Sequence, residues 1–80
     1  MQMLDIGFGS LLSADKIIAV VSPDSSPVKR MISDARERGR LIDATYGRKT
    51  ETVIVLQSDH VVLCALDNEK ISRRLSELKE

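Results

Sequence analysis

The feature that most constrains the fold is a set of short, β-branched apolar runs separated by turn-forming residues. Ile17–Val21 is continuously apolar, and Thr52–Leu56 and His60–Leu66 are joined by Gln57–Asp59, a spacing typical of a β-hairpin. Runs of this kind predict strands that are buried on one or both faces. They are far shorter than the ~20 residues that a membrane-spanning helix needs. The sequence therefore predicts a sheet-based protein without a membrane span.

A central helix is expected over residues 27–38. Its apolar side chains recur at intervals of three and four residues and form one stripe: Val28, Met31, Ile32 and Ala35. Ser26 fits an N-cap and Pro27 fits the first helical position, where a helix leaves the backbone N–H unpaired. Gly39 supplies the helix stop.

Three further elements complete the expected fold. Met3–Gly9 predicts a short strand that ends in a glycine-containing turn, and Leu41–Thr45 predicts another strand. A C-terminal helix over about residues 68–79, capped by Asp67 or Asn68, is apolar on one face and charged on the others, which favours loose packing. The predicted fold class is α+β: a small, mainly antiparallel sheet with one central helix and a C-terminal helix, in a single domain that spans the whole chain.

The small size of the chain makes it marginal as an isolated domain. Eighty residues bury only a little over ~60% of the surface that the unfolded chain exposes, and a single cysteine, Cys64, excludes an internal disulfide. A partner subunit is therefore expected, with Ile17–Val21 and Thr52–Leu56 as candidate contact surfaces. No basic segment followed by a long apolar stretch begins the chain, so we expect no secretion signal and a cytoplasmic location.

Few residues suit catalysis or metal binding. Gly7 and Gly9 resemble part of a phosphate-binding loop, but the further glycine, lysine and serine of that motif do not follow. The single histidine, His60, begins an apolar strand with no nucleophile arranged around it. Cys64 fits a small apolar core residue. We expect no enzyme activity, no cofactor, no metal and no small-molecule substrate.

The charge is balanced overall but unevenly distributed. Residues 29–49 contain seven basic and three acidic residues, a net charge of +4, whereas residues 1–28 and 50–80 each carry −2. A basic segment of this kind indicates a polyanionic partner, with a solvated helix face as the alternative. Phe8 and Tyr46 are the only aromatic residues, which argues against a platform for stacking bases.

One pair of basic residues lies at the expected start of the central helix. Lys29 and Arg30 occupy a position where the helix dipole disfavours positive charge. Together with the two serine hydroxyls before Pro27 and the free N–H groups of the first turn, they fit a phosphate-binding site. The alternative is that Asp24 and Asp34 neutralise them.

A second pair, Arg48 and Lys49, lies on the glycine-containing loop Tyr46–Thr50 between two expected strands. Loop cations that no core contact holds can project into a nucleic-acid groove. Arg48 suits bidentate contacts with phosphate or a guanine edge, whereas Lys49 acts as a point charge. This pattern favours a role in binding a polyanion.

Several phrases of the sequence together resemble the RemA family, the extracellular matrix regulatory proteins of Gram-positive bacteria. The matching segments cover roughly residues 4–66: Asp5–Gly9 (DIGFG), Val21–Ile32 (VSPDSSPVKRMI), Asp34–Arg36 (DAR), Leu41–Thr50 (LIDATYGRKT) and Ser58–Val61 (SDHV). The resemblance implies a DNA-binding transcriptional regulator that activates biofilm-matrix operons. It also implies a closed homo-oligomeric ring, octamer-like, whose subunits are similar to the LytTR DNA-binding domain and whose basic surface binds DNA.

The resemblance also implies roles for individual residues. The family's paired basic residues for DNA fall on Arg48 and Lys49, and a further basic position falls on Lys16. The proline that shapes the loop before the helix falls on Pro27. The family often has arginine where this chain has Lys16 and Lys49, so the charge is kept but the bidentate fork is absent.

Residues and resemblance together predict a cytoplasmic, nucleoid-associated regulator of extracellular matrix (biofilm) genes. It would bind double-stranded DNA through the repeated basic patches of a homo-oligomeric ring. Its expected DNA-binding residues are Arg48, Lys49, Lys16, Lys29 and Arg30. The alternative is an RNA-binding or protein-interaction oligomer that uses the same basic patch.

Overall fold

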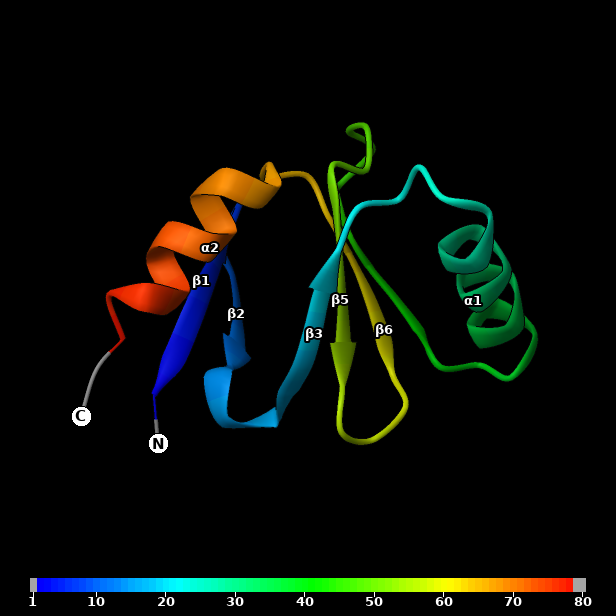
Figure 1. Cartoon of the computed structure of the whole chain (residues 1–80), viewed down its shortest axis with the longest axis horizontal. Coiled ribbons are helices and arrows are strands. Elements are labelled where there is room, and N and C mark those ends of the chain that lie inside the picture. The colour runs from blue at the N-terminus through cyan, green and yellow to red at the C-terminus, as the bar shows by residue number, and fades with distance from the viewer. Residues whose placement is uncertain (1, 79–80) are drawn as a thin grey trace.

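The computed structural model describes residues 2–78, which form two sheets and two α-helices (Figure 1). The elements in chain order are β1 (Met3–Gly7), β2 (Ser10–Ser13), the short 3-10 helix η1 (Ala14–Lys16), β3 (Ile17–Val21), α1 (Ser26–Glu37), β4 (Leu41–Ala44), β5 (Thr52–Leu56), β6 (Val61–Cys64) and α2 (Asn68–Ser76). One sheet has four strands in the order β3-β5-β6-β4, and the hairpin β1–β2 forms the other. The predicted α+β class is confirmed.

The four-stranded sheet is built from the β-branched runs. β5 pairs antiparallel with both β3 and β6, whereas β4 pairs parallel with β6. The sheet is thus mainly antiparallel, as predicted, with one parallel pair in addition. β5 lies inside the sheet, and Thr52, Val53 and Ile54 are buried. Thr52–Leu56 therefore has no free edge for a second subunit, contrary to expectation, and the edges of this sheet are β3 and β4.

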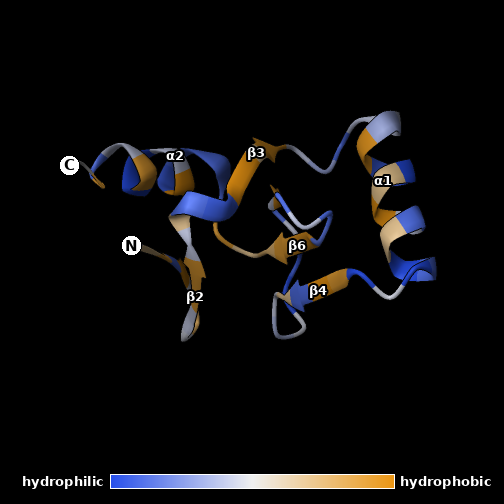
Figure 2. Ribbon diagram, turned by 90° about the horizontal axis from the view of Figure 1, so that it is seen from below, coloured by the Kyte–Doolittle hydropathy of each residue, from blue (hydrophilic) through white to orange (hydrophobic). Residues whose placement is uncertain are grey.

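α1 covers one face of the sheet. Its apolar stripe packs against Val53, Val61 and Leu63, and Figure 2 shows the hydrophobic side of the helix turned toward the strands and its hydrophilic side turned away. The helix starts one residue earlier than predicted: the N-cap is Ser25, whose hydroxyl accepts a hydrogen bond from the Val28 N–H at 3.3 Å. The predicted cap, residue 26, is instead the first helical residue.

The β1–β2 hairpin and α2 cover the opposite face. Leu4 and Ile6 from β1 and Ile71 from α2 are each at most 1% exposed, and they pack with Ile54 and Val62 in one cluster. Burying a side chain such as isoleucine fully is favourable by about 1.5–3 kcal/mol. α2 is therefore part of the core, rather than the loosely packed helix that its charged faces favoured. It ends earlier than predicted, and the last residue of the predicted range lies outside the described residues.

Neither helix in the described part of the chain has the length and hydropathy needed to cross a membrane.

Candidate nucleic-acid interface

The loop that carries Arg48 and Lys49 and the segment that leads into α1 lie at the same end of the four-stranded sheet. The pairing of the strands places the ends of β3, β4 and β6 and the start of β5 together at this end. The turn of the β1–β2 hairpin reaches it as well, at the top of Figure 1. We name it the loop end and define it by residues 7–10, 22–25 and 45–51.

A braced turn opens the loop after β4. The Asp43 carboxylate accepts hydrogen bonds from the hydroxyl and the N–H of Thr45, at 2.6 and 3.0 Å, and these bonds hold the pKa of Asp43 below its ordinary value of 3.8. The Arg48 N–H donates to the Thr45 carbonyl at 3.0 Å. Between them, Tyr46 and Gly47 have φ values of +54° and +83°, the left-handed pair that a type I′ turn requires. The turn therefore fixes the backbone position of Arg48.

The tip of the β1–β2 hairpin packs against this turn. The Cζ atom of Arg48 lies over the ring of Phe8, 4.1 Å from the ring centroid, well within the ~6 Å reach of a cation–π contact. The hydroxyls of Tyr46 and Ser10 are hydrogen-bonded at 2.8 Å. Phe8 and Tyr46 are both exposed, so these contacts agree with the expectation that no core contact holds the loop cations. Arg48 is held at the surface by the hairpin tip, whereas the Lys49 side chain has no partner among the described residues.

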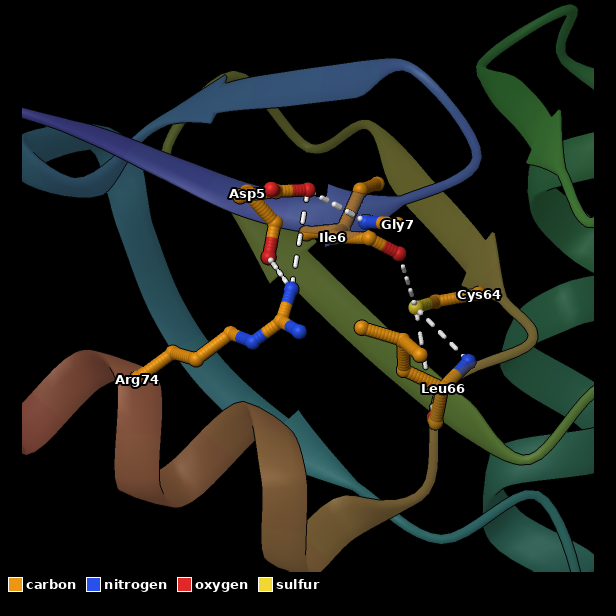
Figure 3. Close-up of polar contacts among 6 residues, drawn as sticks. All are labelled: Asp5, Ile6, Gly7, Cys64, Leu66 and Arg74. Atoms are coloured by element: carbon orange, nitrogen blue, oxygen red, sulfur yellow. Dashed lines mark hydrogen bonds and ion pairs between the residues drawn. The ribbon is translucent and has the colours of Figure 1, made fainter.

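The base of the hairpin is anchored to α2 and β6 (Figure 3). The Asp5 carboxylate accepts a hydrogen bond from the Gly7 N–H at 2.8 Å and lies 3.6 Å from Nη1 of Arg74, which also donates to the Asp5 carbonyl at 2.9 Å. The Cys64 thiol donates to the Ile6 carbonyl at 3.4 Å, and burial raises the pKa of that thiol. Because these contacts fix β1, the hairpin tip is held at the loop end.

The start of α1 carries two cations, Lys29 in the first turn and Arg30 immediately after it, and the first turn contains no acidic residue. Lys29 and Arg30 are both exposed, and Pro27 lies in the same turn, as predicted. Arg30 also lines a groove of about 380 Å³ between α1 and the sheet, and Asp34 is part of the same lining. The acid expected as an alternative neutralising group thus lies near Arg30, although the two do not form an ion pair.

Among residues 2–78, the two loop-end cations, Arg48 and Lys49, have no carboxylate partner, and neither do Lys29 and Arg30 at the start of α1. Within residues 2–78 the structure contains a single ion pair, the one between α2 and β1 described above. Asp24 and Glu51 lie at the same end and offset part of the charge, but neither is paired with a loop-end cation. The positive charge of this surface is therefore accessible.

Lys16 lies at the opposite end of the sheet. It immediately precedes the five-residue strand β3, whereas the loop end begins after that strand. At ~3.3 Å per residue, this places Lys16 roughly 17 Å from the loop end. It lines a separate hollow of about 470 Å³, together with Ser13, Leu56, Gln57 and Ser58. The structure does not bring Lys16 together with the other predicted DNA-binding residues.

His60 and Cys64 have structural surroundings. Nδ1 of His60 is hydrogen-bonded to the Ser58 hydroxyl at 2.7 Å, and the His60 carbonyl accepts the Leu56 N–H at 3.0 Å within the β5–β6 hairpin. Cys64 is fully buried in the core. The structural roles predicted for both residues are confirmed. In the part of the chain that the structure describes, no three His, Cys, Asp or Glu side chains are placed to hold a metal ion.

Phe8, Ser10 and Tyr46 are site residues that the sequence did not predict. The chain contains one phenylalanine and one tyrosine, and each lies beside glycine in a turn. An aromatic side chain in a glycine-flanked turn is a poor fit for a core residue, and this is the signal that could have found them. This signal is easy to overlook, because a chain with only two aromatic residues is not expected to form a platform for stacking bases.

Comparison with known proteins decides the family. The model of a family described as RemA-like, extracellular matrix regulatory protein A-like, matches residues 3–75. The chain belongs to the RemA-like family. This RemA-like chain is 53% identical over 79 residues to extracellular matrix regulatory protein A of Bacillus subtilis. The aligned residues cover 99% of this chain and 89% of that protein.

Two further relatives are named as regulatory proteins. The RemA-like chain is 57% identical over 79 residues to a "putative regulatory protein" of Gloeothece citriformis, covering 99% of this chain and 90% of the relative. A similarly named protein of Symbiobacterium thermophilum is 56% identical over 75 residues, or 94% and 79% of the two chains. The resemblance to RemA is confirmed, and the chain has a regulatory role.

Proposed function

We propose that this RemA-like chain binds double-stranded DNA through its loop-end cations and regulates the transcription of extracellular matrix (biofilm) genes in the cytoplasm. The observation that carries the proposal is the loop after β4. Arg48 and Lys49 are adjacent, exposed and without a carboxylate partner in the described part of the chain, and they extend from a turn that is braced on both sides. No catalytic role is part of the proposal.

The chemistry of the loop end suits phosphate. Most contacts that position a protein on DNA are made to phosphate oxygens by arginine, lysine and backbone N–H groups. Arg48 offers a planar fork of N–H donors, Lys49 adds a point charge, and Lys29 extends the basic surface along the first turn of α1. Contacts of this kind carry little direct sequence information, so recognition would rest largely on the shape and deformability of the DNA.

A homo-oligomeric ring is the second part of the proposal. The strand β3 is a free edge of the sheet, and Ile18, at a bulge in that strand, is 62% exposed. Leu11 and Ile42 are also large, exposed apolar side chains. Pairing of β3 edges and packing of these apolar side chains between copies would bury additional apolar surface, and this would stabilise a chain whose own core is small. A ring repeats one weak basic site several times, and linked sites bind DNA at high effective concentration.

The test combines mass with binding. Light scattering should give a mass several times that of one chain, and fluorescence anisotropy should show binding to a long AT-rich DNA duplex that is tighter than binding to an RNA duplex of the same sequence. Arg73→Ala is the matched control, because Arg73 is an exposed cation on α2, outside the loop end. A mass equal to one chain would overturn the ring, and equal binding of DNA and RNA would favour the alternative RNA-binding function.

A further inference from the structure

Both aromatic residues of the chain meet at one exposed junction, and both have strained backbones. Phe8 and Tyr46 have φ values of +55° and +54°, in the left-handed region. Bulky side chains rarely adopt this conformation, and it persists only where surrounding contacts hold it. The two residues are 42% and 60% exposed, so burial in the core does not explain their placement.

The contacts at this junction converge on Arg48. Phe8 lies between Gly7 and Gly9, so the hairpin tip is a run of three left-handed residues. The Phe8 ring lies against the Arg48 guanidinium, while the hydrogen bond between Ser10 and Tyr46 ties the hairpin tip to the turn that carries Arg48.

We propose that Phe8 is a positioning residue for Arg48: the hairpin tip clasps the guanidinium and orients it toward a DNA phosphate. We name Phe8, Ser10 and Tyr46 the clasp. The inference rests on the proposed function and adds to it a residue from a distant part of the sequence. It also distinguishes the two loop cations, because Lys49 has no such contact among the described residues.

The physical advantage of the clasp is preorganisation. A ring that covers one face of a guanidinium leaves the N–H donors at its rim available, which is the geometry that a bidentate phosphate contact uses. An arginine that is already ordered loses less side-chain entropy when it binds. The clasp therefore raises affinity without adding a contact to DNA.

The main test is a double-mutant cycle on DNA affinity. Phe8→Leu removes the ring but keeps a side chain with a Cβ at the left-handed position, so the backbone strain is preserved. The affinity for an AT-rich duplex should fall about two- to five-fold for each engaged subunit, the range of an exposed cation–π contact, and Phe8→Trp should retain wild-type affinity. In an Arg48→Ala background, Phe8→Leu should have no further effect.

The outcomes separate the clasp from the proposed function. Wild-type protein that does not bind DNA overturns both. Wild-type binding with an unaffected Phe8→Leu variant overturns the clasp alone, as does an equal loss of affinity in the Arg48→Ala background, which would mean that the ring contacts DNA itself. Oligomer mass and melting temperature are checked for each variant. If Phe8→Leu alters either, Tyr46→Phe provides the test: it removes one hydroxyl, and its effect on affinity should also vanish in the Arg48→Ala background.

Discussion

Lys49 offers the cleanest single test of the proposed DNA interface. Its side chain is exposed and has no partner among residues 2–78, so Lys49→Ala removes a charge without disturbing any interaction within the folded protein. Folding and assembly should be unchanged. Arg48→Ala removes the same charge, but it also removes the stacking on Phe8. Lys49→Ala therefore measures the effect of charge alone, whereas Arg48→Ala measures the combined effect of the charge and of its fixed position.

The magnitude follows from counterion release. Each phosphate that a basic side chain neutralises contributes about −0.9 to the slope of log K against log salt concentration. Removing one such cation from each of two engaged subunits should therefore lower the magnitude of this negative slope by about 1.8. Between about 50 and 200 mM salt, each neutralised phosphate accounts for roughly a 3.5-fold change in affinity. Lys49→Ala and Arg48→Ala should lower the slope equally, while Arg48→Ala should weaken binding more because a fork-like donor is removed.

The assay is a salt titration of binding to a long AT-rich duplex, followed by fluorescence anisotropy, with the oligomer mass measured for every variant. Arg73→Ala, on the exposed side of α2, should match wild type in both affinity and slope. Variants of Arg48 and Lys49 that assemble normally and keep the wild-type slope would refute the assignment of these residues to phosphate.

Four other changes have defined outcomes. Lys16→Ala, at the far end of β3, should lower the salt slope additively with Lys49→Ala if DNA spans both ends of the sheet, and an unchanged slope would confine DNA to the loop end. Pro27→Ser should cost about 0.5–1 kcal/mol through the greater freedom of the unfolded chain, measured by urea unfolding, and should weaken DNA binding. Ile71→Ala should cost about 2–5 kcal/mol, because this side chain is fully buried; a small change in melting temperature would contradict the packing of α2. Because its pKa is lowered in the folded state, the Asp43 carboxylate should stabilise the protein at neutral pH and lose that effect as the pH falls below 3.8 through the folded-state pKa; thermal melts of wild type and Asp43→Asn should converge in acid.

The fold was predictable where local signals are strong. Ile17–Val21 and Thr52–Leu56 are rich in β-branched residues, which fit the half-buried surface of a sheet, and both form strands as predicted. Ser10–Ser13 contains no β-branched residue, and its pattern did not predict this strand. The cap of α1 was placed one position too late because two consecutive serines precede Pro27 and proline is tolerated throughout the first turn.

The site was predictable only in its charges. Arg48 and Lys49 are visible as a basic pair next to glycine, but the contact between Arg48 and Phe8 joins residues that are distant in the chain. Such a contact depends on how the hairpin is placed over the sheet, and no periodicity or spacing encodes that placement. The separation of Lys16 from the loop end has the same origin, because it follows from the direction of β3.

The anchoring of the hairpin by α2 sets an order for folding during synthesis. Asp5 and Arg74 are 69 positions apart in the chain, so the hairpin leaves the ribosome long before the helix that holds its base. Until α2 emerges, Leu4 and Ile6 lack Ile71, with which they share a core cluster. Contacts between such distant residues form slowly, because the chain must first lose entropy. A nascent chain that stalls before α2 would therefore present its basic loop beside a hairpin that lacks its α2 anchor, and the synthesis of α2 becomes a condition for an ordered loop end.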